Sequence, residues 1–320
     1  MLIAAAILLL SALLGVLIHR ASSCGVSAVK TWVLTGRADA VVGLGLAAGG
    51  AAAVSLLWEG FGGGATMEMT ARLAVLGLLG AAGVGVGAVI NGACLLGSIA
   101  RLGNGELRFL AIFPGLALGF GVADFAMAAT QAGQAAVLGG SAAITSPLAP
   151  PGGARLVVVL ATLALAAFWP FAPNGAKGAW SMRWAMPLLG VVGGCLYALQ
   201  PGWTYSDAIH GVVRAQTTMM SIAIRPLALL SIAALAVGAV LSGRALVGFA
   251  WRAADLRGWC ASFAGAVLMG IGGAFAGGGN DHLIFWALPH LQASALVAYT
   301  VMTGTIALLV FTRHRRHVPA

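Results

Sequence analysis

Cys94 lies inside a glycine-rich break, residues 89–103, that separates two long apolar stretches of the chain. A thiol is a weak hydrogen-bond donor and a soft, polarizable contact for a sulfur-containing solute, and it becomes a nucleophile only as the thiolate. A buried cysteine can equally behave as a small hydrophobe, which is how we interpret Cys195 and Cys260. Because glycines flank Cys94, we consider it a candidate contact for a solute.

A second glycine break matches the first at a constant shift of 185 residues. The shift places residues 85–87 on 270–272 and residues 91–94 on 276–279 without a gap. Two repeats that break at corresponding positions are the best sequence pointer to a transport site. The alternative is that two runs of Gly, Ala and Leu overlap by chance.

Cys24 marks a further break, where small residues follow the first apolar stretch. A shift of 186 residues places His210 on Cys24 and Gly211 on Gly25, so each half of the chain is expected to hold two interruptions. Non-helical backbone is tolerated at membrane depth only where protein or a water-filled cavity receives its polar groups. We therefore expect the four breaks to converge on one passage, where their helix N-termini offer N–H groups to an anion.

The second glycine break carries a polar cluster, formed by Asn280, Asp281 and His282. Asn280 can donate a hydrogen bond to an anion. Asp281 would repel an anion, and we interpret it as the cap of a short helix that begins there. A catalytic Asp–His pair is the weaker alternative, because no nucleophile lies at a recognisable elbow.

Asp124 is the one carboxylate away from the ends of a predicted membrane span, and ionisable groups at such positions are functional candidates. Two interpretations are equally supported by the sequence. In the first, Asp124 relays a proton or pairs with Arg225. In the second, it lies close to the outer surface and is solvated.

Composition places the chain among polytopic membrane proteins. Of its 320 residues, 60% are hydrophobic and 8% are charged, and the mean hydropathy is +0.99, whereas soluble proteins have about 25% charged residues. The net charge of +9 does not indicate nucleic acid, because most basic residues lie singly between apolar segments, as in cytoplasmic loops. The four cysteines lack metal-ligand and disulfide spacings, and no GxxxxGK[ST] loop occurs. We therefore expect no metal, no cofactor and no ATP hydrolysis.

Charges and clusters of glycine or proline delimit nine predicted membrane spans of about 20 residues each. The spans are 1–18, 39–58, 72–91, 107–129, 155–172, 185–201, 226–243, 259–276 and 292–312. The first is interpreted as a retained span and not as a cleaved signal peptide. The basic tail 313–317 is expected in the cytoplasm, which places the N-terminus outside and most Lys and Arg residues inside.

The repeat groups these spans into a single membrane domain with four, one and four spans. Repeat one covers about 1–129, the joining span about 155–172 and repeat two about 185–312. Five spans separate each corresponding pair, and an odd separation gives the two copies opposite orientations, as in many transporters. The predicted fold is therefore an all-α inverted repeat, with short or re-entrant helices at the breaks.

Three segments, 23–36, 91–105 and 268–281, resemble the signatures of the YeeE/YedE family of bacterial inner-membrane sulfur transporters. They carry a cysteine in a glycine break, an Arg-Leu-x-x-Gly sequence, and an LMG tripeptide with a late GGND. The resemblance covers nearly the whole chain and implies uptake of inorganic sulfur compounds, thiosulfate in the characterised branch, through an hourglass of inverted repeats. It also implies hydrogen bonds from thiols to sulfur at the constrictions, and a small cytoplasmic sulfur-carrier protein as a partner.

The family cysteines are matched only in part. Cys24 matches the first and Cys94 the second, whereas Gly278 and Gly279 occupy the region where the third is expected. This departure shortens the implied thiol relay. It leaves thiosulfate, another sulfur or selenium species, and a different small anion as alternative solutes.

From these observations we hypothesise an importer of a small sulfur-containing anion that is not an enzyme. The candidate site residues are Cys24, Gly92, Cys94, Gly97, His210, Gly278, Gly279 and Asn280, with Asp124 as a candidate proton relay. One alternative is a membrane sulfur-relay enzyme that carries a persulfide on Cys94, which would then label quickly with a thiol reagent. The other is an anion channel without energy coupling.

Overall fold

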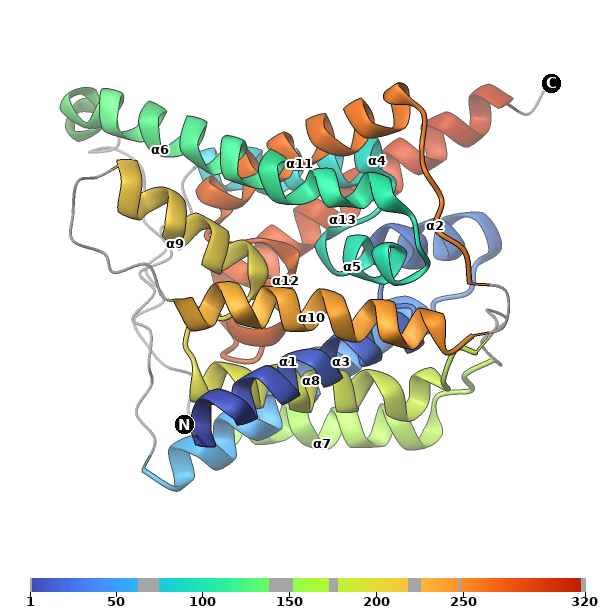
Figure 1. Ribbon diagram of the computed structural model, residues 1–320. Coiled ribbons are helices and arrows are strands. Elements are labelled where there is room, and N and C mark those ends of the chain that lie inside the picture. The colour runs from blue at the N-terminus through green and yellow to red at the C-terminus, as the bar shows by residue number, and fades with distance from the viewer. Residues whose placement is uncertain are drawn as a thin grey trace.

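The computed structural model describes residues 2–62, 75–137, 152–172, 178–217, 226–246 and 249–317. These residues are mainly helical, and among them one isolated β-bridge joins Glu106 to Arg252. In chain order the elements are α1 (Leu2–Arg20), α2 (Gly25–Thr35), α3 (Asp39–Gly60), α4 (Val75–Asn91), α5 (Leu95–Gly103), the 3₁₀ turn η1 (Leu107–Ala111), α6 (Ile112–Val137), α7 (Gly152–Phe168), α8 (Met182–Leu199), α9 (Tyr205–Thr217), α10 (Pro226–Arg244), α11 (Leu256–Ala276), α12 (Asn280–His282), the π-helical turn η2 (Leu283–Ala287) and α13 (Ala293–His317). Most of the long helices run roughly along one axis of the molecule (Figure 1).

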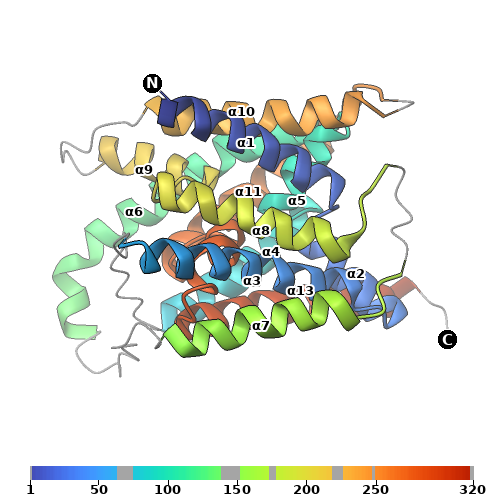
Figure 2. The ribbon, with the colours of Figure 1, turned by 90° about the horizontal axis from the view of Figure 1, so that it is seen from below.

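Eight stretches of described helix are long and apolar enough to cross a membrane. The predicted span 155–172 corresponds to α7, an apolar helix of 17 residues that is shorter than these eight, so the predicted count of nine is not confirmed. α7 packs against α3 at the edge of the molecule (Figure 2). Arg155 of α7 donates two hydrogen bonds to Glu59, and the indole N–H of Trp169 donates to Asp39. These contacts hold α7 to both ends of α3.

The two predicted glycine breaks separate a long helix from a short one. α4 is followed by Gly92, with φ +80°, and α11 by Gly277, with φ +82°. Glycine adopts this left-handed conformation without the steric cost of a Cβ, and it commonly ends helices in this way. Cys94 then precedes α5 and Gly279 precedes α12. Both long helices therefore end through the same backbone geometry, at positions 185 residues apart.

α4 and α11 cross at close range through glycines on both helices. A Cβ at Gly80 would lie 2.6 Å from the backbone oxygen of Gly272, and a Cβ at Gly265 would lie 2.6 Å from that of Gly87. Small residues permit such backbone approach, which van der Waals packing stabilises in membranes. Larger side chains at these four positions would separate the two helices.

The other long helices form matching pairs around this crossing. α1 packs along α10, and α3 packs along α8 (Figure 2). α6 packs on α11, whereas α13 packs on α4. The short helices follow the same scheme, with α9 on α6 and α2 on α13. The start of α1 and the end of α13 lie at opposite ends of the molecule (Figure 1).

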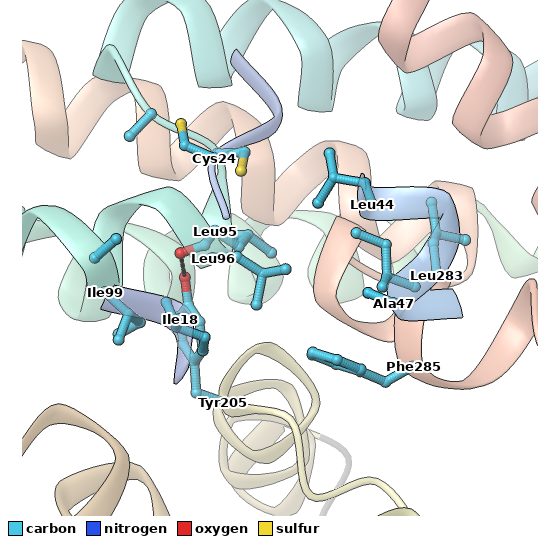
Figure 3. Packing of buried hydrophobic residues seen from close by; sticks show 14 of the residues in the cluster. Ile18, Cys24, Leu44, Ala47, Leu95, Leu96, Ile99, Tyr205, Leu283 and Phe285 are labelled. Atoms are coloured by element: carbon cyan, nitrogen blue, oxygen red, sulfur yellow. Dashed lines mark hydrogen bonds between the residues drawn. The ribbon is translucent and has the colours of Figure 1, made fainter. Parts of the chain in front are cut away.

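The apolar core surrounds the short helices. Leu95, Leu96 and Ile99 of α5 lie in it together with Ile18 of α1 and Tyr205 of α9 (Figure 3). All five side chains are at most 2% exposed. Because tightly packed side chains have few alternative rotamers, this packing fixes the position of α5 and of the break that precedes it.

Candidate functional site

Four short helices begin close together inside the molecule. α2, α5, α9 and α12 begin at Gly25, Leu95, Tyr205 and Asn280. Side-chain hydrogen bonds link the start of α5 to the starts of α2 and α12, and link α12 to the start of α9. The first N–H groups of a helix have no partner within the helix, and they carry partial positive charge. The four starts therefore gather polar groups that must be satisfied from outside each helix.

Cys94 caps two of these helices. Its sulfur accepts a hydrogen bond from the N–H of Gly97 at 3.4 Å, as the N-cap of α5, and another from the N–H of Gly25 at 3.1 Å, at the first residue of α2. Cys94 is 1% exposed. The sulfur therefore lies at two helix N-termini, where partial positive charge favours an anion beside it.

Cys24 lies next to Cys94 and precedes α2 as its N-cap. Both are free thiols, and both lie against Gly97, whose N–H donates to the sulfur of Cys94. A Cβ at Gly97 would overlap the sulfur of Cys24, so the missing side chain at position 97 makes room for this thiol. Cys24 and Gly97, both predicted site residues, are therefore brought together with Cys94.

A polar cavity of about 240 Å³ lies beyond Cys24. Ser27, Arg101 and Asn104 line it, together with His19. The ring of His19 is fixed by a hydrogen bond of 3.0 Å between Nε2 and the side-chain oxygen of Asn104. The cavity therefore presents hydroxyl, amide and guanidinium groups beside the Cys24 thiol.

Gly92 lies beside an arginine. A Cβ at Gly92 would lie 3.4 Å from Nη2 of Arg108, and Nη1 of the same side chain donates to the carbonyl oxygen of Asn91 at 3.2 Å. Gly92 therefore ends α4 next to the guanidinium group of Arg108. Among the described residues, no thiol lies within 4 Å of its Cβ position.

Asn280 contacts the helix that Cys94 caps. Its side-chain oxygen accepts a hydrogen bond of 3.1 Å from the N–H of Leu95. A Cβ at Gly279 would overlap the side chain of Leu95, and a Cβ at Gly278 would lie 2.6 Å from the ring of His282. Gly278 and Gly279, where the resemblance predicts a third cysteine, therefore pack against a histidine and a leucine.

Asp281 caps α9 and not the short helix to which it belongs. Its Oδ1 accepts from the hydroxyl of Ser206 at 2.7 Å, and its Oδ2 accepts from the N–H of Ser206 at 3.4 Å. The N-cap of α12 is Gly279. The prediction that Asp281 is the cap of its own helix is therefore wrong: Gly279 holds that position, and the carboxylate accepts hydrogen bonds from the first turn of α9.

His282 belongs to a largely buried network that the sequence did not predict. Its Nδ1 lies 2.9 Å from Oδ2 of Asp207 and 3.0 Å from the hydroxyl of Tyr197, and this hydroxyl donates to Asp207 at 2.7 Å. Tyr197 lies in α8 and Asp207 in α9, so only the tertiary fold brings them together. The one signal in the sequence was a carboxylate between two predicted spans.

His210 lies within α9 and not at a helix start. The break that was expected at His210 and Gly211 lies at Thr204, immediately before α9. The ring of His210 stacks on that of Phe120 of α6, with ring centroids 4.3 Å apart. The predicted match of His210 with Cys24 is therefore wrong. Cys24 precedes α2, and the residue that precedes α9 is Thr204.

Asp124 pairs with this histidine. Its Oδ1 lies 3.1 Å from Nε2 of His210 and 3.8 Å from Nε of Arg214. Asp124 is 7% exposed, so the interpretation as a solvated surface group is wrong. The alternative partner, Arg225, lies outside the described residues.

The geometry supplies two adjacent thiols beside helix N-termini, a cavity lined in part by polar side chains, and two carboxylate–histidine pairs that each have one buried partner. The family model described as "Sulphur transport" matches residues 20–308 of the chain. This range includes both thiols, all four helix starts and the network around His282. None of the curated proteins matches the chain.

Proposed function

The chain belongs to the sulphur transport family, and we propose that it imports a small sulfur-containing anion across a bacterial inner membrane. The observation that carries this proposal is the position of Cys94, whose sulfur lies at the first residues of both α2 and α5. Helix N-termini favour anions, and a thiol offers a soft, polarizable contact for sulfur. A site that combines both favours an anion that contains sulfur.

The solute would pass Cys94 first and Cys24 second. Cys94 is 1% exposed, whereas Cys24 is 7% exposed and lines the polar cavity with Ser27 and Arg101. In this order the solute meets the narrowest part of the route at Cys94, and it is then released past Cys24 into the wider cavity. Exposed basic groups around the opening of this cavity would attract the anion only weakly, since salt screens the attraction within about 8 Å.

We infer that this route runs between two inverted repeats, one from about 1 to 129 and the other from about 185 to 312, joined by α7 as a ninth span. In this scheme α1 corresponds to α8 and α3 to α10, so the packed pair α1–α10 corresponds to the packed pair α8–α3. Likewise α4 corresponds to α11 and α6 to α13, so the pair α6–α11 corresponds to the pair α13–α4. The matched glycine ends of α4 and α11 support the same relation. Nine spans would place the N-terminus outside and the C-terminus in the cytoplasm.

Thiosulfate is the first solute to test. Because Leu95 fills the region of the third family thiol, a sulfur or selenium species that needs only two thiol contacts is the alternative. A small sulfur-carrier protein is the proposed cytoplasmic partner at the cavity mouth. A persulfide relay on Cys94 would need access for an acceptor, and the burial of Cys94 does not favour it.

Growth of a sulfur-transport-deficient bacterium that expresses the chain, on thiosulfate or on other single sulfur sources, tests the proposal. We expect the parent chain to support growth on thiosulfate or a related anion, and Cys94→Ala to abolish it. The matched control is Cys260→Ala, because Cys260 is exposed and lies apart from the helix starts. Equal growth of Cys94→Ala and the parent, at equal membrane abundance, would show that the site assignment is wrong.

A further inference from the structure

Nε2 of His282 is a buried nitrogen without a hydrogen-bonding partner among the described residues. His282 is 2% exposed, and its ring packs where Gly278 has no side chain. Buried polar atoms are nearly always paired, and an unpaired one costs free energy. A nitrogen held in this way is therefore a place where a proton or a hydrogen-bonding solute can bind.

The other ring nitrogen of His282 is already committed. An ionised carboxylate only accepts hydrogen bonds, so the contact of 2.9 Å between Nδ1 and Asp207 Oδ2 places the hydrogen on Nδ1. The hydroxyl of Tyr197 donates to the same carboxylate oxygen at 2.7 Å. In the neutral ring Nε2 then carries a lone pair, and a proton bound there makes an imidazolium that Asp207 stabilises directly.

The charge of this region is unfavourable for an anion unless a proton is bound. Asp207 and Asp281 bring two carboxylates to the starts of α9 and α12, and His282 is the cation-forming group between them. The other ionisable groups that interact with this network are Tyr197, Tyr205, Cys94 and His290. All of these except His290 are neutral or negative over the physiological range, and His290 is engaged with the carbonyl oxygen of Trp286 at 2.7 Å.

We propose, on the basis of the transport function proposed above, that His282 and Asp207 form a proton-binding site that couples solute movement to proton entry. One proton adds to Nε2 of His282 and gives an imidazolium beside ionised Asp207. The anion then moves past the start of α5, which Asn280 contacts two residues before His282. The proton then leaves Nε2 towards the cytoplasm, so one proton crosses the membrane with the solute in each cycle and the neutral ring is restored.

The proposed route of protons to this site starts on the side of the molecule on which α3 ends. Tyr197 lines a small cavity of about 20 Å³ together with Glu59, Trp286 and His290, which is roughly the space that one water needs. The end of α3 lies on the same side as the start of α1 (Figure 2). The Asp207 side chain is 20% exposed, against 2% for His282, so the carboxylate can exchange protons with water while the ring stays buried.

The test uses the purified full-length chain in liposomes, with radiolabelled thiosulfate outside and the membrane potential clamped at zero. A gradient of one pH unit, alkaline inside, should drive up to about tenfold accumulation for each proton carried, because one pH unit is 1.36 kcal/mol. A pH-sensitive dye in the lumen should report acidification that depends on thiosulfate. Accumulation that does not depend on the pH gradient, without acidification of the lumen, would overturn the proposed coupling.

Variants locate the site. His282→Gln and Asp207→Asn should each lose gradient-driven accumulation while exchange of labelled for unlabelled thiosulfate continues. His314→Gln, at an exposed histidine near the end of α13, should keep the driven accumulation. Driven accumulation by His282→Gln at the parent level would overturn the assignment even if Asp207→Asn fails to fold. If the parent chain exchanges no sulfur anion at all, the transport function itself is contradicted, and the coupling with it.

Discussion

The side-chain oxygen of Asn280 accepts a hydrogen bond of 3.1 Å from the N–H of Leu95, and these two residues are 185 positions apart. The same spacing aligns the glycine that follows α4 with the glycine that follows α11. Leu95 and Asn280 are each the first residue of a short helix. The two glycine breaks thus meet at corresponding residues, and a side chain from one break satisfies an orphan amide of the other.

Replacing Asn280 with alanine should destabilise the protein. The change leaves the buried N–H of Leu95 without an acceptor, which costs about 1–3 kcal/mol. Thermal unfolding in detergent should show a lower Tm for Asn280→Ala. Thr300→Ala is the matched control, because its exposed hydroxyl bonds only within its own helix turn, and it should leave Tm unchanged. Equal Tm values for the two variants would contradict the role of Asn280 as a cap.

Comparing Cys94→Ser with Cys94→Ala should distinguish the role of Cys94 as a helix cap from its role as a sulfur contact for the solute. Serine is a preferred N-cap residue, so Cys94→Ser should unfold close to the parent Tm. Cys94→Ala leaves the amides of Gly25 and Gly97 without their acceptor and should lose about 1–3 kcal/mol.

Uptake of labelled thiosulfate should fail in both Cys94 variants, because neither side chain offers a soft contact to sulfur. Cys260→Ser, at an exposed position, should transport as the parent does. If Cys94→Ser transports at the parent rate, the helix starts alone recognise the solute and the thiol is not needed.

The sequence predicted the two glycine breaks well, because the left-handed backbone at Gly92 and Gly277 needs a residue type that composition reveals directly. It failed at the start of α9, where the left-handed glycine is Gly202, three residues before Tyr205, whereas the constant shift pointed to His210. The registers of the two halves differ there, so a fixed shift does not find the corresponding break.

The polar contacts of the site were less predictable than its breaks. Asp207 and Tyr197 lie on different helices, and their meeting with His282 depends on how α8, α9 and α12 pack. Asp281 was identified as a cap, but the helix that it caps follows from tertiary structure. For α7, composition predicts an apolar helix, and the structure gives it 17 residues that end just before Trp169 and Pro170.

Gly97→Ala should disturb the thiol pair, whereas Gly25→Ala should be tolerated. A Cβ at Gly97 would overlap the sulfur of Cys24, but a Cβ at Gly25 would lie 3.6 Å from the sulfur of Cys94, an ordinary contact. Overpacking typically costs about 1–3 kcal/mol, so Gly97→Ala should lower Tm and reduce uptake of labelled thiosulfate. Both are glycines of short helices that gain the same methyl group, so each is the control for the other. Equal behaviour of the two variants would place Cys24 elsewhere.

Gly279→Cys should restore a thiol in the region of the missing family cysteine only if Leu95 is also shortened. A Cβ at Gly279 would overlap the Leu95 side chain and would lie 2.6 Å from Oδ1 of Asp281, so the single variant should lose stability and uptake. Leu95→Ala alone should cost about 2–5 kcal/mol, because it leaves a cavity in the core.

In the double variant the new thiol occupies the space that Leu95 vacates. The two changes should therefore be less costly together than their sum, with a favourable coupling of about 0.5–3 kcal/mol, as found for residues in direct contact. Thermal unfolding of the four proteins of this cycle measures the coupling, and uptake of labelled thiosulfate shows whether the third thiol assists transport. Strict additivity of the two single changes would mean that Leu95 does not fill the region beside Gly279.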